Sequence, residues 1–185
     1  MIVIGLLRFL GLLNAAVWFG ATFFFIFVAE PASTHSEAMR ELLGAKSFPY
    51  FSIAISQVIG GRFYGLFLVC ALLAMLHMGA EWLYFGKYPR RIWLLLIFGL
   101  FLGGLAQTYG LQTKIKRLLL LQHAANGSFE QRRAAEYSGR LWRAASAGLN
   151  LILLSGLGIY LWRLSNTPDE MRFVGASDFT GKFRS

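Results

Sequence analysis

Two thioethers, an imidazole and a carboxylate lie within two helical turns of an apolar stretch, at Met75, His77, Met78 and Glu81. Thioethers and imidazole are soft ligands that suit monovalent copper. Met75 and His77 point to different faces of one helix, however, so a copper ion would need further ligands from elsewhere. His77 and Glu81 are four residues apart and share a face, which makes them the one pair that resembles a proton-handling site.

Other resident cofactors find less support. A haem held by two histidines would need a second histidine inside an apolar segment, and His35 and His123 both fall in polar segments. A haem with a single ligand, or one shared with another subunit, remains an alternative. Cys70 is the only cysteine, which excludes a disulfide framework or a multi-cysteine metal site. We find no serine-histidine-acid arrangement, phosphate-cradling loop or metalloprotease motif, so we expect no catalytic residue and no resident cofactor.

A stripe of polar side chains descends into the last apolar run. Arg143, Ser146 and Asn150 lie at helical spacing, with the amide deepest. Because polar groups inside a membrane are costly, we predict that Asn150 faces other helices and bonds to one of them, for example to Asn14 or Gln107. The expected interior polar network consists of Asn14, His77, Glu81, Gln107 and Asn150.

Three further charged residues are candidates for ion pairs. Glu30 and Arg143 are expected at the same membrane boundary, where they would approach each other or share a partner. Arg8 is expected at a depth from which it could reach Glu81. These groups act either as contacts between helices or as the lining of a small polar cavity.

The composition indicates an integral membrane protein. Of the 185 residues, 56% are hydrophobic and only 15% are charged, whereas soluble domains are about 45–50% apolar and about a quarter charged. The net charge of +9 comes from residues in loops and at the ends of apolar runs. This pattern favours anchoring to anionic lipid headgroups over nucleic-acid binding.

Four segments are long and apolar enough to cross a bilayer as helices. They cover about residues 2–29, 62–85, 92–111 and 144–162. The third helix is expected to continue to about residue 122, and Ser128 with Gln131 predicts a capping box that restarts the fourth. The expected fold is all-α: an integral membrane four-helix bundle over residues 1–165, with helices 3 and 4 extended beyond the bilayer as a hairpin, and an extended tail over residues 166–185.

Aromatic residues support these boundaries as two interfacial belts. One belt would contain Trp82, Tyr84, Tyr88, Trp93, Tyr160 and Trp162, and the other Tyr64, Tyr109 and Trp142. Basic residues are divided almost equally between the two sides, so the positive-inside rule does not set the orientation. We expect a multi-pass protein of the bacterial inner membrane.

Small residues and the tail are the candidate contacts with partners. Gly61 with Gly65, and Gly99 with Gly103, form GxxxG pairs that either pack inside one bundle or face a second protein. In the tail, phenylalanines are spaced as separate anchors against another subunit, at Phe173, Phe179 and Phe183.

Two blocks of sequence point to a family. The stretch NAAVWFGATFFFIFVAEPAS, followed by LLGAKSFPYF, and the later RLWRAASAGLNLILL resemble the transmembrane protein 205-like family of small four-helix membrane proteins. The resemblance implies the fold and no particular reaction. The chain departs from the family pattern at Arg143, where the family has a histidine, and at Glu30, which is inserted in its V-A-P motif.

The leading functional hypothesis is therefore a non-catalytic membrane protein that acts as an accessory or structural subunit of a larger complex. One alternative is a small transporter or copper-handling protein that uses the polar interior. A second alternative is a haem- or cofactor-binding redox subunit.

Overall fold

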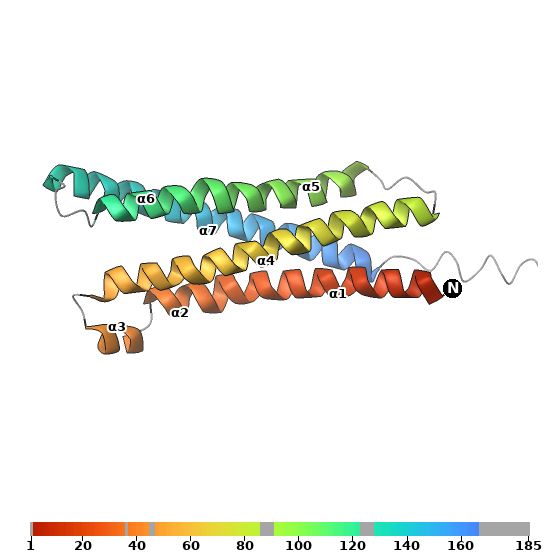
Figure 1. The fold of residues 1–185 in the computed structure, drawn as a ribbon, viewed down its shortest axis with the longest axis horizontal. Helices are drawn as coiled ribbons and strands as arrows, with labels where there is room; N and C mark the ends of the chain where they lie inside the picture. The colour runs from red at the N-terminus through yellow and green to blue at the C-terminus, as the bar shows by residue number, and fades with distance from the viewer. Residues whose placement is uncertain (1, 36, 45–46, 86–90, 123–127, 167–185) are drawn as a thin grey trace, which may run out of the picture.

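The computed structural model describes residues 2–35, 37–44, 47–85, 91–122 and 128–166, and within these ranges it contains helices and no strands (Figure 1). The C-terminal tail and its predicted contacts lie outside the described residues.

The first long helix contains a π-helical turn. It consists of α1 (Ile2–Phe24), the π-helix η1 (Phe25–Ala29) and α2 (Glu30–His35). The short helix α3 (Glu37–Leu43) follows and ends at Gly44, whose φ of 73° lies in the left-handed region that favours glycine.

The second long helix starts earlier than the sequence predicts. The expected second span begins at about residue 62. α4 (Phe48–Phe85) begins about 14 residues earlier, so it includes a segment that was expected to lie outside this span. Pro49 lies in the first turn of α4, where its missing N–H would have no helical partner in any case. The Gly60–Gly61 pair lies inside the helix.

The third and fourth long helices match their expected extent. The third consists of α5 (Arg91–Leu105), the π-helix η2 (Ala106–Leu111) and α6 (Gln112–Gln122), and the fourth is α7 (Phe129–Ser165). The predicted capping box at the start of α7 is confirmed. The backbone N–H of Gln131 donates to Ser128 Oγ, and the N–H of Ser128 donates to Gln131 Oε1, each at 3.3 Å.

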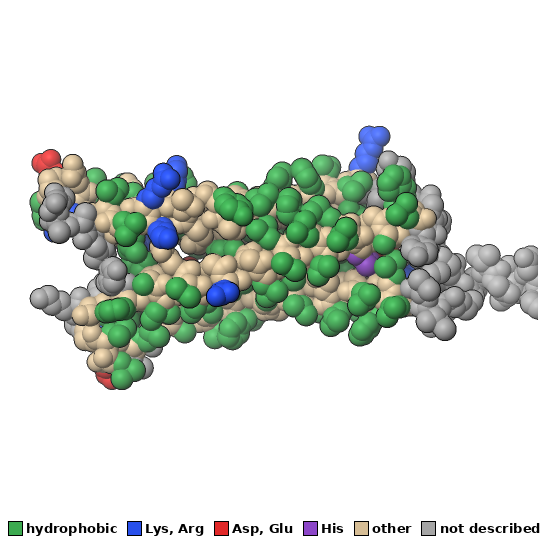
Figure 2. Space-filling view, in the orientation of Figure 1, with side chains coloured by type: hydrophobic (Ala, Val, Ile, Leu, Met, Phe, Trp, Pro, Cys, Tyr) green, Lys and Arg blue, Asp and Glu red, His purple; other side chains and the backbone are tan. Residues whose placement is uncertain are grey.

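All four long helices could cross a membrane. The qualifying segments are Gly5–Ser33, Phe51–Leu83, Arg91–Gln122 and Phe129–Ser165. Figure 2 shows hydrophobic side chains along the visible face, with the visible acidic groups confined to the end that carries α3 and the start of α7. Many large apolar side chains are exposed on the surface of the helices, for example Leu76 and Leu95, each 70% exposed. Exposing so much apolar surface to water would be unfavourable. The protein therefore spans a membrane.

The core forms where α1 contacts both α4 and α7, while the α5–α6 helix contacts the same two helices (Figure 1). The Trp18 ring packs edge-on against Phe67, with centroids 5.0 Å apart, and against Tyr160 at 6.4 Å. The prediction that Tyr64 and Tyr160 belong to interfacial belts is wrong. Each is 1% exposed, because it lies on the face of its helix that packs against other helices.

Close packing of glycines only partly follows the GxxxG pairs. A Cβ atom at Gly103 would lie 2.6 Å from the Leu153 side chain, and one at Gly104 would lie 2.7 Å from the Phe67 ring. A Cβ at Gly61, Gly65 or Gly99 would meet nothing within 4 Å. The Gly61–Gly65 pair therefore faces outward and does not pack inside the chain.

Candidate functional site

The hydroxyl group of Tyr64 is the centre of a buried polar cluster that joins three helices. It accepts a hydrogen bond from Gln107 Nε2 at 2.7 Å. It also lies within hydrogen-bond distance of both ends of the Asn150 amide, 3.2 Å from Oδ1 and 3.1 Å from Nδ2. Gln107 Nε2 donates in addition to Ser146 Oγ. We call Tyr64, Gln107, Ser146 and Asn150 the tyrosine cluster.

The cluster confirms one sequence prediction and changes its details. Asn150 is 3% exposed and bonds to another helix, as predicted. Its partner is Tyr64 on α4, however, and not Asn14. Gln107 takes part by sharing the same hydroxyl group. The sequence did not reveal Tyr64, because a tyrosine two residues after Arg62 resembles a residue of the membrane interface.

The two π-helices lie close to the cluster. Gln107 belongs to η2 and is fully buried. Phe25 belongs to η1, and its ring packs edge-on against Tyr64 with centroids 5.6 Å apart. Two threonine hydroxyls donate to carbonyls four residues back: Thr22, just before η1, to Trp18, and Thr108, within η2, to Gly104. Such bonds compete with the helical pattern and bend it, and π-helical turns occur frequently at functional sites.

One buried acceptor in the cluster is left over. Gln107 Oε1 has no hydrogen-bond partner among the described residues, although the residue is fully buried. Buried amide oxygens are nearly always satisfied, so this atom is a position for a water molecule or another donor.

Next to the cluster is a cavity of about 750 Å³ between α1–α2, the start of α4 and α7. Asn150 belongs to both the cluster and the cavity lining. Most of the wall is apolar, and four polar residues interrupt it. The cavity is lined by Ile26, Phe27, Glu30, Pro31, Phe48, Ser52, Ile53, Arg143, Ala144, Ala147, Asn150 and Leu151.

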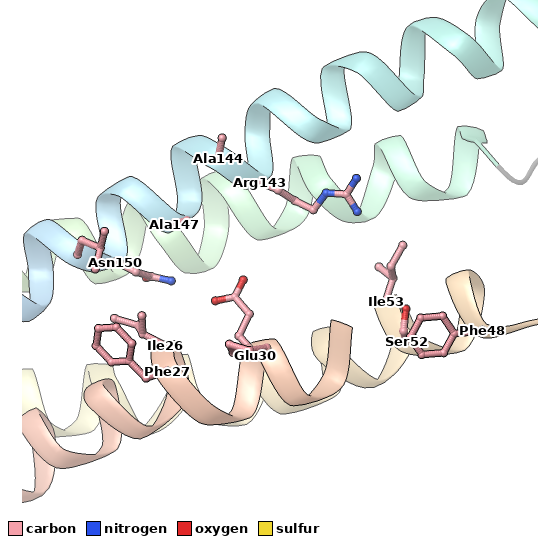
Figure 3. A pocket seen from close by; sticks show the side chains of 12 residues that line it. Ile26, Phe27, Glu30, Phe48, Ser52, Ile53, Arg143, Ala144, Ala147 and Asn150 are labelled. Atoms are coloured by element: carbon pink, nitrogen blue, oxygen red, sulfur yellow. The ribbon is translucent and has the colours of Figure 1, made fainter. Parts of the chain in front are cut away.

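Glu30 and Arg143 contribute opposite charges to the same cavity (Figure 3). The Glu30 carboxylate points across the cavity toward α7, and the Asn150 amide points toward it from the other side. The Arg143 side chain extends away from Asn150, toward the part lined by Ser52 and Ile53. Glu30 and Arg143 therefore line one cavity, and their predicted approach, or contact with a common partner, stays a prediction.

The remaining polar residues of the predicted network lie nearer the other end. Asn14 Nδ2 donates to the carbonyl oxygen of Cys70 at 3.0 Å, and His77 Nε2 donates to that of Leu7 at 2.9 Å. Glu81 is half-buried and interacts electrostatically with Arg163 on α7. The predicted contact between Arg8 and Glu81 stays a prediction. Gln107 and Asn150 thus belong to the tyrosine cluster, whereas Asn14 and His77 each bond to a backbone carbonyl of another helix.

The copper candidates do not converge within the described part of the chain. Met75 and Met78 line a second, smaller cavity of about 330 Å³ with Trp82, whereas His77 is directed to α1. Among the described residues, no group of three histidine, cysteine or acidic side chains could hold a metal ion. Copper handling therefore rests on the sequence pattern alone.

In comparisons with known proteins, no family model, no curated protein and no solved structure matches this chain.

Proposed function

We propose that this chain is a non-catalytic integral membrane protein that binds a small amphiphilic molecule in the cavity between α1–α2, α4 and α7. In this proposal the long helices form a four-helix bundle, and the third and fourth extend beyond the bilayer as a hairpin. We place the protein in the bacterial inner membrane, and its resemblance to the transmembrane protein 205-like family agrees with this build.

The observation that carries the proposal is the combination of groups in the cavity wall. Its volume of about 750 Å³ lies within the range of about 300–1,000 Å³ that is usual for small-molecule sites. Such sites are mainly apolar, with a few polar groups that fix the orientation of the ligand. Ile26, Phe27 and Leu151 supply apolar wall, and Glu30 and Arg143 supply charge. A molecule with a polar head and an apolar chain matches both parts.

The position of the cavity along the helices supports the same class of ligand. Arg143 directly precedes the apolar run of α7, and Glu30 directly follows that of α1. Both charges therefore lie where a membrane-spanning helix meets the headgroup region. Phe27 and Leu151 are 52% and 49% exposed, so the deeper end of the cavity is bordered by residues that face lipid.

Blocking the cavity should abolish binding of a dansyl-labelled fatty acid to the protein in maltoside micelles. Ala147 lines the cavity, so a tryptophan in its place, Ala147→Trp, would fill part of the volume. We expect wild type to enhance the dansyl fluorescence saturably with one molecule per chain, and A147W to weaken this binding by at least about tenfold, which corresponds to ~1.4 kcal/mol.

The matched control is Ala145→Trp, which places the same side chain on an exposed position of α7 that does not line the cavity. A145W should bind like wild type. Equal binding by A147W and wild type, with both proteins folded, would show that the cavity is not the binding site.

A second candidate function is the accessory subunit expected from the sequence. The observation in its favour is the exposed Gly61–Gly65 face of α4, on which a Cβ would meet nothing within 4 Å. Small residues let two membrane helices approach closely. In this case a transmembrane helix of another subunit would cover the face.

Cross-linking in intact membranes tests this second candidate. A Gly61→Cys variant, made in a Cys70→Ser background to remove the buried native thiol, should give one cross-linked adduct of defined mass with a membrane protein. Gly20→Cys is the control, since Gly20 is also exposed and open but lies on α1. The same adducts from both positions would mean random collisions and would reject a specific α4 face.

A further inference from the structure

The order of the groups along the cavity specifies the ligand more closely, if the proposed binding function holds. α7 supplies Arg143 and Asn150, which are seven positions apart, or about 10 Å along a helix axis at ~1.5 Å per residue. Leu151 continues from Asn150 into the apolar run. The cavity thus has a cationic outer end, an amide level below it and an apolar inner end.

Glu30 belongs to the level of Asn150. The two side chains point toward one another across the cavity in Figure 3, and Asn150 is bonded to Tyr64 behind it. Ile26 and Phe27, one turn earlier on the same helix, line the cavity on the apolar side. The carboxylate therefore lies between the apolar wall and Arg143.

The hydrogen-bonding capacity at this level is not used up by the protein. Asn150 Nδ2 carries two N–H groups, and the Tyr64 hydroxyl can accept only one of them. The second N–H is available to an acceptor in the cavity. A carboxylate such as Glu30 accepts several hydrogen bonds, so it can bind a cationic N–H group in addition to its contacts within the protein.

We infer that the ligand is a zwitterionic amphiphile in which an ammonium group lies between the apolar chain and an anionic end group. The anionic end, a carboxylate or phosphate, binds to Arg143, because guanidinium groups hold such oxygens through two parallel N–H donors. The ammonium donates to Glu30, and the chain lies along Ile26, Phe27 and Leu151. Membrane phosphatidylethanolamine has the reverse order, with its ammonium at the outer end.

Displacement of the dansyl-labelled fatty acid distinguishes these orders. 4-(Dodecylamino)butanoate has the proposed order, and three methylenes between its ammonium and its carboxylate give it the length to reach from Glu30 to Arg143. Heptadecanoate has the same chain length with a methylene in place of the ammonium. We expect 4-(dodecylamino)butanoate to displace the probe at about tenfold lower concentration, since a charge-assisted hydrogen bond contributes at least ~1.4 kcal/mol. Lysophosphatidylethanolamine, with the reverse order, should compete no better than heptadecanoate. Free 4-aminobutanoate should not compete, because it has no chain.

Two variants assign the ends of the ligand. Glu30→Gln should reduce the preference for 4-(dodecylamino)butanoate over heptadecanoate to about one, because the amide lacks the charge that favours the ammonium. Arg143→Gln should weaken both ligands by roughly threefold, a modest loss because this guanidinium is exposed. Glu37→Gln and Arg140→Gln, which change exposed residues outside the cavity lining, should change neither value. Unfolding midpoints check that all four variants are folded, and Arg143→Lys replaces R143Q if that variant does not fold.

The outcomes separate the two proposals. Equal competition by 4-(dodecylamino)butanoate and heptadecanoate, with A147W still defective, would overturn the zwitterionic ligand and leave the binding function standing. Better competition by lysophosphatidylethanolamine would overturn the proposed order. Competition by free 4-aminobutanoate would replace an amphiphile with a soluble amino acid. Probe binding that survives in A147W would overturn both proposals.

Discussion

Replacing Gly104 by alanine is expected to lower the free energy of unfolding by about 1–3 kcal/mol, the usual cost of forcing extra volume into a packed interior. The added Cβ would lie 2.7 Å and 2.8 Å from two ring atoms of Phe67 and 3.3 Å from a methyl group of Leu68. The Phe67 ring cannot move away easily. It is 1% exposed and is held by Trp18 at 5.0 Å and by Phe63 at 6.1 Å.

The measurement is reversible unfolding of the purified protein in mixed micelles by titration with dodecyl sulfate. Gly99→Ala is the matched control, because it makes the same change on α5 at a position where the Cβ meets nothing within 4 Å. We expect G99A to change the unfolding free energy by less than about 0.5 kcal/mol. If G104A and G99A unfold alike, α4 and α5 do not approach as closely at this point as the structure shows.

Removing the Tyr64 hydroxyl should have the second-largest effect. Tyr64→Phe leaves the ring in place but deprives Gln107 Nε2 and the Asn150 amide of their common partner. Hydrogen bonds between membrane helices contribute about 0.6 kcal/mol on average and about 1.7 at most. We expect a loss near the upper value, because one hydroxyl serves two buried amides.

A double-mutant cycle with Asn150→Leu tests whether the two residues act together. We expect N150L alone to lower the free energy of unfolding by roughly 0.6–2 kcal/mol. The double variant should lose at least about 0.5 kcal/mol less than the two single variants added together, because both changes remove the same bond. Tyr109→Phe serves as the control, since Tyr109 is 70% exposed. Strictly additive costs would argue against the bond between Tyr64 and Asn150.

The overall build could be predicted from the sequence because it depends on local properties. The long apolar runs and the Ser128–Gln131 capping box each depend on neighbouring residues only, and each predicted the right element. The start of α4 was predicted too late, since Pro49 and Gly60–Gly61 are already part of the helix. Pro49 is compatible with a helix because it lies in the first turn. Gly60 and Gly61 are compatible because they need no special backbone conformation there.

The candidate site could be predicted only in part. The spacing of Arg143, Ser146 and Asn150 was enough to predict that Asn150 faces other helices, because a polar stripe on an apolar helix avoids lipid. That spacing says nothing about which helix lies opposite. Asn14 and His77 were expected in the same polar network as Gln107 and Asn150, and the structure shows them bonded to the carbonyls of Cys70 and Leu7.

The sequence by itself thus determined that this is a helical membrane protein and which face of α7 is polar. Only the tertiary structure decided that Tyr64 joins Gln107 and Asn150, that Gly61 and Gly65 face outward, and that Glu30 and Arg143 line one cavity. The physical reason is that these relations depend on how each helix is rotated about its own axis. A π-helical turn such as η1 or η2 changes that rotation, and no local pattern in an apolar segment reveals it.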